Sequence, residues 1–453
     1  MSRTDDIPSA RIAEWRARLR GHGIGDGDQD RLERTLREQV SGLVAAGLDS
    51  DEAFLIAVKR TAGLSAAARE FNQAHAGWLW RQLAARPVAG IGQLPLRGDL
   101  VLAAALALAA AAAVKAPALF GAQFDTASGG FYARNLGLLV LPLLAALLLG
   151  RHGVTPARSV TIGVLFAAGA VFANVFPFLP GGATENLTAT HLPIALWLVV
   201  GLAHAGNGWR TASGRMEFVR FSGEWLIYYV LFALGGGVLT LLTAALFEAV
   251  GVGIDGFLEQ WLLPCGAAGA VIVAGWLAEG KNGVAGQLAP LLAQVLSPLF
   301  AALLVAFLAV MVWTGAGIAV DREVLIAFDL LLVLVVGMLL YAISARDPEA
   351  PLGVSDTLRL VLAVAALVAD LAALAAVAAR IGEFGFSANK VAALGVNLLL
   401  LAHLAGTAWL HVRFLAGTGS FAAVARWQTA YLPVYGVWAA LVVVLFPPLF
   451  RYL

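Results

Sequence analysis

Charged residues are scarce in this sequence. Only 13% of its 453 residues are Asp, Glu, Lys or Arg, whereas 60% are hydrophobic. Soluble domains contain about 25% charged and about 45–50% apolar residues, so a water-soluble fold of this composition could not cover its surface with polar groups. The formal net charge of +1 excludes the strong electrostatic attraction that supports nucleic-acid binding. We therefore expect the lipid bilayer as a partner, and no nucleic acid.

Cysteine is nearly absent, because Cys265 is the only one in the chain. A single thiol excludes an intrachain disulfide and a cysteine-based metal cluster. The sequence also lacks the Walker A, H-E-x-x-H and G-x-S-x-G motifs of nucleotide, zinc and serine chemistry. His152 and His204 fall near the ends of predicted helices, and His403 has no metal-binding residue four positions away. We therefore expect no enzyme, no catalytic residue, no metal and no cofactor.

The charged residues that are present divide the chain into unequal parts. Residues 1–99 hold 14 of the 30 Lys and Arg and 13 of the 29 Asp and Glu, and residues 100–453 hold the remainder. This distribution predicts a soluble helical head at 1–90, a linker at 91–99 and a transmembrane helical domain at 100–453.

Apolar residues of the head recur at steps of three and four, as on one face of an amphipathic helix. They are Leu32, Leu36, Val40, Leu43 and Val44. Gly47 is suited to end this helix, and Asp49 with Glu52 has the pattern of a capping box that opens the next one. The head is thus predicted to be a small bundle of about four helices.

Four stretches of the head have a family pattern: Leu-Glu-Arg-Thr-Leu-Arg-Glu-Gln-Val at 32–40, Leu-Val-Ala-Ala-Gly-Leu at 43–48, Glu-Ala-Phe at 52–54 and Ala-Arg-Glu-Phe at 68–71. They resemble the permease prefix domain, a short helical module that precedes membrane segments in many bacterial proteins. That family usually has a Leu-Gly-Asp-Pro turn where this chain has Thr-Ala-Gly-Leu at 61–64. The resemblance implies a helical head in front of a membrane domain.

From Asp99 onward, apolar runs are long enough to cross about 30 Å of hydrocarbon as helices. We predict eleven spans, at 100–120, 136–150, 159–180, 191–208, 225–250, 261–278, 290–315, 324–344, 358–379, 391–411 and 431–450. The run at 136–150 is short unless it begins near Ala133. A ten-helix alternative without it would reverse the membrane orientation of every later span.

The placement of Lys and Arg favours the eleven-helix arrangement. With the head in the cytoplasm, ten of these residues fall in inner loops and five in outer loops or at the C-terminus, as the positive-inside rule requires. We therefore expect an all-α, polytopic helical membrane protein of the cell (plasma or inner) membrane. Its N-terminus is expected in the cytoplasm and its C-terminus outside.

A second family pattern lies between two predicted spans. The stretch Arg-Ile-Gly-Glu-Phe-Gly-Phe-Ser-Ala-Asn-Lys at 380–390 contains five motif residues: Arg380, Glu383, Gly385, Asn389 and Lys390. It is similar to an Arg-Ile-x-Glu-aromatic-Gly-x-Ser/Thr-x-Asn-basic signature of a bacterial multi-pass membrane family, filed as domain of unknown function 4153. Residues 218–263 also look like that family. The resemblance implies a membrane architecture and no particular reaction.

Four ionisable residues lie within predicted spans or at their ends, where they are costly and mark a pathway or a buried pair. They are Lys115, Asp329, Asp370 and Glu248. All fall in the predicted outer half of the membrane, and Asp370 is the deepest at about 13 Å. Alternatives stay open: Lys115 reaches the headgroups, Asp329 is solvated at the interface, and Asp370 has either a structural partner or a transport role. We predict that Lys115 and Asp370 share a buried site, with Asp329 at its mouth.

Gly235, Gly236 and Gly237 lie in the middle of one span. Glycines there permit close packing of helices or a break that binds a ligand. With the buried charges, this triplet favours a permease-like transporter or channel component regulated by its cytoplasmic head. The alternative is a non-transporting membrane adaptor or sensor, whose residues 1–90 dock a cytoplasmic protein partner.

Overall fold

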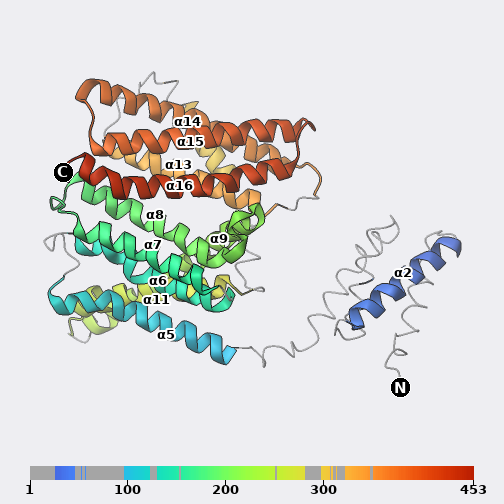
Figure 1. The fold of residues 1–453 in the computed structure, drawn as a ribbon, viewed down its shortest axis with the longest axis horizontal. Helices are drawn as coiled ribbons and strands as arrows, with labels where there is room; N and C mark the ends of the chain where they lie inside the picture. Colours follow the sequence, from blue (N-terminus) through green and yellow to red (C-terminus); the bar gives the residue numbers. More distant parts are fainter. Residues whose placement is uncertain are drawn as a thin grey trace. The chain divides into compact units, whose positions relative to one another are not determined.

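The computed structural model describes residues 26–45, 53, 57, 96–122, 130–152, 155–249, 252–280, 297–306, 308–309, 313, 322–346 and 350–453. The chain divides into two compact units, Met1–Leu96 and Arg97–Leu453, and the division falls within the predicted linker (Figure 1). All the regular elements among the described residues are helical. The all-α prediction is therefore confirmed for this part of the chain.

In the first unit, helix α2 (Asp26–Ala45) carries the amphipathic pattern of the sequence. Leu36 and Val40 of this helix are fully buried, as are Ala53 and Ala57 farther along the chain. These residues form part of a core within the unit, on the face that the spacing predicts. The other predicted helices of the head lie outside the described residues.

The second unit contains long apolar helices together with several short helical segments. They are α5 (Leu96–Lys115) with η2 (Ala116–Phe120), α6 (Phe131–His152), α7 (Pro156–Val175), α8 (Ala183–Ala205) with η4 (Gly206–Arg210), α9 (Ala212–Ala249), α10 (Asp255–Phe257), η5 (Leu258–Leu262), α11 (Leu263–Ala278), α13 (Arg322–Ser344), α14 (Val354–Phe384), α15 (Ala388–Leu415) and α16 (Phe421–Leu449). Within the described ranges, nine helical stretches are long and apolar enough to cross a membrane. The protein thus has the build of a multi-pass helical membrane protein.

The predicted span at 290–315 is described only in part, whereas the one at 324–344 lies within α13. Shorter apolar helices at Ser297–Ala306 and Asp329–Ser344 fall within the runs at 290–315 and 324–344. The total of eleven spans therefore stays a prediction. The short run at 136–150 belongs to α6, which has 22 residues because it begins at Phe131, and this helix is long enough to cross.

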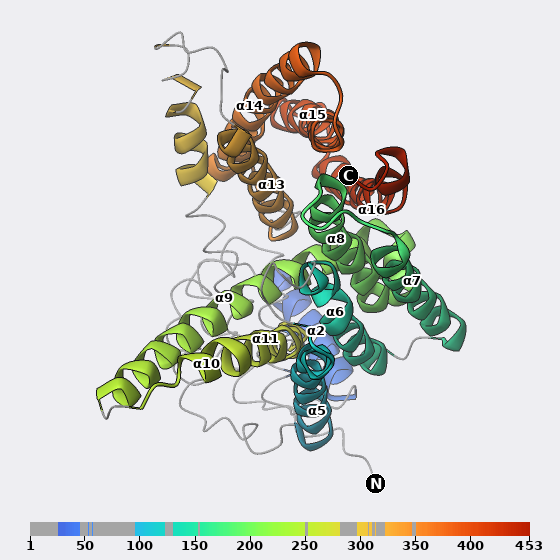
Figure 2. The same ribbon diagram turned by 90° about the vertical axis from the view of Figure 1, so that its left-hand side faces the viewer.

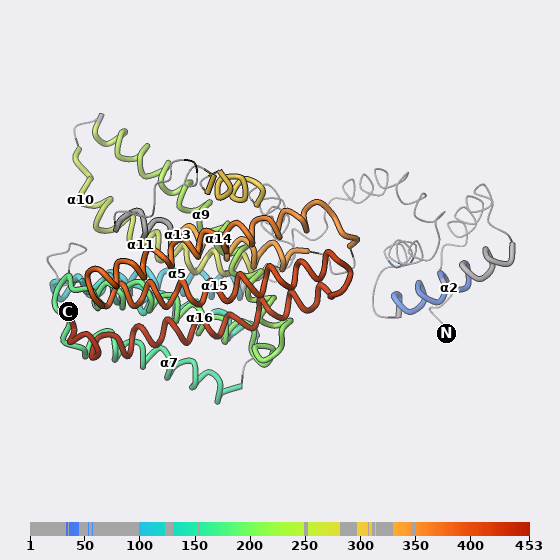
Figure 3. The backbone as a smooth tube through the Cα atoms, turned by 90° about the horizontal axis from the view of Figure 1, so that it is seen from above, coloured from blue at the N-terminus to red at the C-terminus, as the bar shows by residue number. Residues whose placement is uncertain are grey.

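The helices of the second unit form two groups joined by α8 (Figure 2). One hydrophobic core lies mainly among α5, α6, α7, α8 and α11, with Phe218 and Phe221 of α9. The other lies mainly among α13, α14 and α15. Figure 3 shows α14, α15 and α16 side by side along most of their lengths. We call α13–α16 the C-terminal bundle.

Two glycines let α15 and α16 approach closely. A Cβ added at Gly395 would overlap the indole ring of Trp438, and one at Gly406 would overlap that of Trp427. Each tryptophan therefore occupies space that a side chain on α15 would otherwise fill, which brings the two helices into close contact.

The start of α5 and the end of the chain lie at opposite ends of α8 (Figure 1). At one end, Thr184 N donates a hydrogen bond of 2.8 Å to Leu453 O. At the other end, His204 lies beside His152, and the adjacent Arg151 pairs with Asp99 at 3.5 Å. An odd number of crossings between Asp99 and Leu453 agrees with this arrangement.

Candidate functional site

Asp370 is a fully buried carboxylate near the middle of α14. Neither of its oxygens accepts a hydrogen bond from the described residues. An ionised carboxylate in this position is costly unless it is paired, and ionisable groups inside the membrane mark functional sites by default. Asp329 of α13 and Tyr435 of α16 both lie close enough to interact with it electrostatically.

Asp329, unlike Asp370, has a hydrogen-bond donor. Nδ2 of the fully buried Asn397 on α15 donates to Oδ1 of Asp329 at 3.1 Å. The same nitrogen also donates to the carbonyl oxygen of Ala393 at 2.9 Å. The structure thus brings together two of the predicted residues, Asp370 and Asp329, and adds Asn397, which the sequence analysis did not identify.

His403 of α15 and Tyr435 of α16 share a hydrogen bond of 2.7 Å between Nδ1 and the phenol oxygen. The imidazole stacks on the ring of Tyr431, with 4.5 Å between centroids and 9° between planes. Nε2 of His403 has no hydrogen-bond partner among the described residues. The two tyrosines therefore fix the imidazole in position, and Gln428 lies within interaction reach of it.

More buried polar groups continue along α15 toward its C-terminal end. His403, Thr407 and His411 recur every four residues and so share one face of the helix. Gln428 Nε2 of α16 donates to Thr407 Oγ1 at 2.7 Å, and His411 Nδ1 donates to Thr407 O at 3.0 Å. His411, Thr407 and Gln428 are each 1% exposed, so this row of polar groups lies inside the bundle.

A buried charge cluster lies beyond His411, at the start of α14. Asp356 accepts hydrogen bonds of 2.7 Å from both Arg346 and Arg359, and His411 lies within electrostatic reach of all three. From Asp356 to Asp370, α14 rises about 21 Å, more than half of the hydrocarbon thickness of about 30 Å. We call the series from this cluster to Asp370 the polar file; its members are Arg346, Asp356, Arg359, His411, Thr407, Gln428, His403, Tyr435, Asp370, Asp329 and Asn397.

Lys115 does not belong to this site, and the predicted pair with Asp370 is wrong. Its Nζ donates to Gln260 O at 2.6 Å and lies 4.3 Å from the ring centroid of Trp261. Helix α5 lies on the opposite side of the unit from α14 (Figures 1 and 2). The backbone carbonyl and the aromatic face satisfy the ammonium group locally, so it needs no buried carboxylate.

Two other predicted features are also placed away from the polar file. Glu248 lies exposed near the end of α9. Helix α9 continues without a break through Gly235, Gly236 and Gly237, and no described atom lies within 4 Å of a Cβ added at any of them. Among the described residues, the triplet therefore neither breaks the helix nor packs closely.

The family-like motif at 380–390 forms the turn between α14 and α15. Gly385 caps α14 with a φ of +72°, a conformation that favours glycine. Lys390 Nζ donates to Gly385 O at 2.8 Å and lies 5.4 Å from the ring centroid of Phe384. Arg380 and Glu383 belong to the last turns of α14, and Asn389 to the first turn of α15. These contacts give the motif a role in closing the turn.

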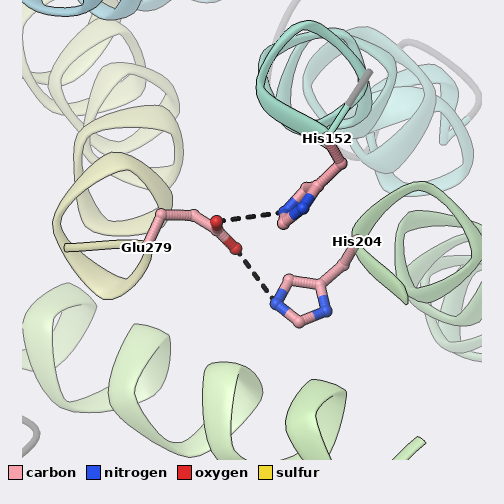
Figure 4. Close-up of side chains that lie close together, drawn as sticks. All are labelled: His152, His204 and Glu279. Atoms are coloured by element: carbon pink, nitrogen blue, oxygen red, sulfur yellow. Dashed lines mark ion pairs between the residues drawn. The ribbon is translucent and has the colours of Figure 1, made fainter. Parts of the chain in front are cut away.

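A second polar cluster lies outside the C-terminal bundle and was missed by the sequence analysis. His152, His204 and Glu279 converge from the ends of α6, α8 and α11 (Figure 4). Burial alone would raise the pKa of Glu279, but the contacts with the two imidazoles outweigh it and hold the pKa at about 2. The three residues are far apart in the sequence, so no spacing pattern reveals them.

No protein-family model, curated protein or solved structure matches the chain. The resemblances to the permease prefix domain and to the family of unknown function 4153 therefore stay expectations.

Proposed function

We propose that the protein is a permease-like transporter in which the polar file of the C-terminal bundle carries protons, or takes up a proton in exchange for a solute. One observation supports this most: Asp370 is a fully buried carboxylate without a hydrogen-bond donor among the described residues. A purely structural carboxylate would gain stability from a donor. Asp370 is instead suited to change its protonation state.

The groups around Asp370 support a proton relay. A proton on Asp370 would remove its charge, and with it the cost of burial and the repulsion from Asp329. Tyr435 lies within electrostatic reach of Asp370 and shares a 2.7 Å hydrogen bond with His403, whose face of α15 continues to Thr407 and His411. Imidazole and phenol groups both donate and accept protons, so they are chemically suited to pass one along.

Asp356 would form the other end of the proton route that begins at Asp370. Its two arginine partners hold fixed positive charge at the start of α14, which would repel free cations, while His411 lies within electrostatic reach of them. A route of this kind favours proton transfer between side chains over the passage of hydrated ions.

The remaining parts of the proposal concern the head and the orientation. We place the head at residues 1–90 in the cytoplasm, as a regulator of the membrane unit, and Leu453 on the outside of the cell membrane. The Lys and Arg asymmetry and the positions of Asp99 and Leu453 at opposite ends of α8 support this arrangement.

Purified full-length protein in liposomes tests the proposal. A potassium gradient with valinomycin sets a membrane potential, and a pH-sensitive dye inside the vesicles reports proton entry. We expect faster acidification than in protein-free vesicles. Vesicles that stay silent, with and without candidate solutes outside, would contradict transport; a cytoplasmic protein that co-purifies with the silent protein would favour the adaptor.

A further inference from the structure

The cluster of His152, His204 and Glu279 has the geometry of a metal site. Nε2 of His152 lies 3.1 Å from Oε2 of Glu279, and Nε2 of His204 lies 3.0 Å from Oε1. One donor atom from each of the three side chains lies within 4.8 Å of the others. The dashed lines of Figure 4 show both imidazoles directed at a single carboxylate.

These short contacts leave polar atoms unsatisfied. Oε1 of Glu279 accepts no well-oriented hydrogen bond from the described residues, despite its 3.0 Å separation from His204. The Glu279 side chain is only 10% exposed, so the atom is also shielded from water. A buried carboxylate oxygen that faces an imidazole nitrogen without a well-oriented hydrogen bond has the surroundings of a ligand atom.

The donor set selects the class of ion. Two imidazole nitrogens and one carboxylate oxygen are a common Zn²⁺ set, which leaves a fourth position for water. Bonds of about 2.0–2.1 Å in a tetrahedral site place ligand atoms about 3.3 Å apart, close to the 3.1 Å and 3.0 Å between each imidazole nitrogen and its nearest carboxylate oxygen. Mg²⁺ and Ca²⁺ prefer all-oxygen sites. The His152 side chain is 34% exposed, so an ion can reach the cluster from solvent.

The surrounding charges also favour a cation. Glu217 and Glu224 of α9 lie within electrostatic reach of His152 and Glu279, respectively. The positive charge of Arg151 near His152 opposes cation binding, but this arginine pairs with Asp99 at 3.5 Å. Arg220 near Glu224 is a second positive charge, so the three carboxylates Glu217, Glu224 and Glu279 exceed the two arginines by one, a balance that favours a cation.

We propose that His152, His204 and Glu279 bind one divalent transition-metal ion of the Zn²⁺ class, which joins the ends of α6, α8 and α11. The site uses no residue of the polar file and is independent of the proposed transport function. The ion would hold together α6, α8 and α11, outside the C-terminal bundle. The stability of this group of helices would then depend on the available metal concentration.

The test uses full-length protein purified in detergent without a histidine tag. The protein is stripped with a chelator, incubated with Zn²⁺ and desalted, and its metal content is measured by mass spectrometry. We expect about one Zn²⁺ per chain in the wild type, and a loss of roughly tenfold or more in Glu279→Gln and His204→Ala. The control is His191→Ala at the other end of α8, where Nδ1 donates to Leu187 O, and it should keep its Zn²⁺.

A second measurement separates metal loss from misfolding. Zn²⁺ should raise the Tm of the wild type and of His191→Ala, because an ion that binds only the folded state stabilises it. It should leave the Tm of Glu279→Gln and His152→Ala unchanged, while both variants elute as folded protein on size exclusion. Wild type without bound Zn²⁺, or variants that bind as much as the wild type, would overturn the proposal.

Discussion

Asn397 donates a hydrogen bond of 3.1 Å to Asp329 and so connects α15 to α13 inside the C-terminal bundle. The neighbouring Asp370 receives no such bond from the described residues. Asp329 and Asp370 lie within electrostatic reach of each other but have different surroundings. Asp329 accepts a hydrogen bond from an amide, and Asp370 has no donor among the described residues. This difference is the reason to assign the proton-carrying role to Asp370.

Replacing Asn397 with Leu should destabilise the protein by about 1–3 kcal/mol, because Asp329 then loses its donor in a partly buried place. Thermal unfolding in detergent measures the loss. Adding Asp329→Leu to Asn397→Leu should cost less than the sum of the two single changes. Losses that add within about 0.5 kcal/mol would show that the two side chains do not depend on each other.

Asp356→Ala should be among the most destabilising single changes, with a loss of about 3–5 kcal/mol. It removes the shared carboxylate of Arg346 and Arg359, which are each 7% exposed, and leaves two buried guanidinium groups close together. The matched control is Arg158→Gln, which loses an exposed hydrogen bond to Asn207 and should stay within about 0.5 kcal/mol of the wild type. Equal melting temperatures for the two variants would refute the buried network.

Gly406→Ala should lower stability by about 1–3 kcal/mol, because the added methyl group overlaps Trp427 in a packed interface. Gly236→Ala provides the comparison, since open space surrounds that position among the described residues. Alanine is the better helix former by about 1 kcal/mol, so this second variant should be as stable as the wild type or more so. The reverse order of melting temperatures would mean that the α9 glycines pack against another element.

Much of the helical architecture could be predicted from the sequence, because a membrane span is a local property. Any run of about 20 apolar residues must form a helix to satisfy its backbone in lipid. The same reasoning identified Asp370 and Asp329 as candidate site residues, since each is an ionisable side chain within an otherwise apolar run. Leu36 and Val40 of α2 were placed on a buried face by their spacing for a similarly local reason.

The arrangement of the helices could not be predicted in this way. Hydropathy contains no information on which helix lies beside which, and the pairing of Lys115 with Asp370 was wrong for that reason. Lys115 instead contacts a backbone carbonyl oxygen and an aromatic ring of η5. The cluster of His152, His204 and Glu279 was missed because its members come together only when three helix ends meet.

A reporter fused after Leu453 should be found outside the cell, and one inserted near Gly353 should be found inside. The excess of Lys and Arg in the predicted inner loops drives this orientation. Leu453 and Asp99 lie at opposite ends of α8, which agrees with an odd number of crossings between them. Reporters found on the same side of the membrane would disprove the eleven-span arrangement.

The most direct test of the account compares Asp370→Asn with Glu248→Gln in the liposome proton-flux assay. Both changes replace one carboxylate with an amide, but Asp370 is fully buried in the polar file and Glu248 is exposed at the end of α9. We predict that Asp370→Asn reduces proton flux to the level of protein-free vesicles and that Glu248→Gln retains wild-type flux, at equal protein incorporation. Wild-type flux in Asp370→Asn would contradict the central claim that this buried carboxylate carries the proton.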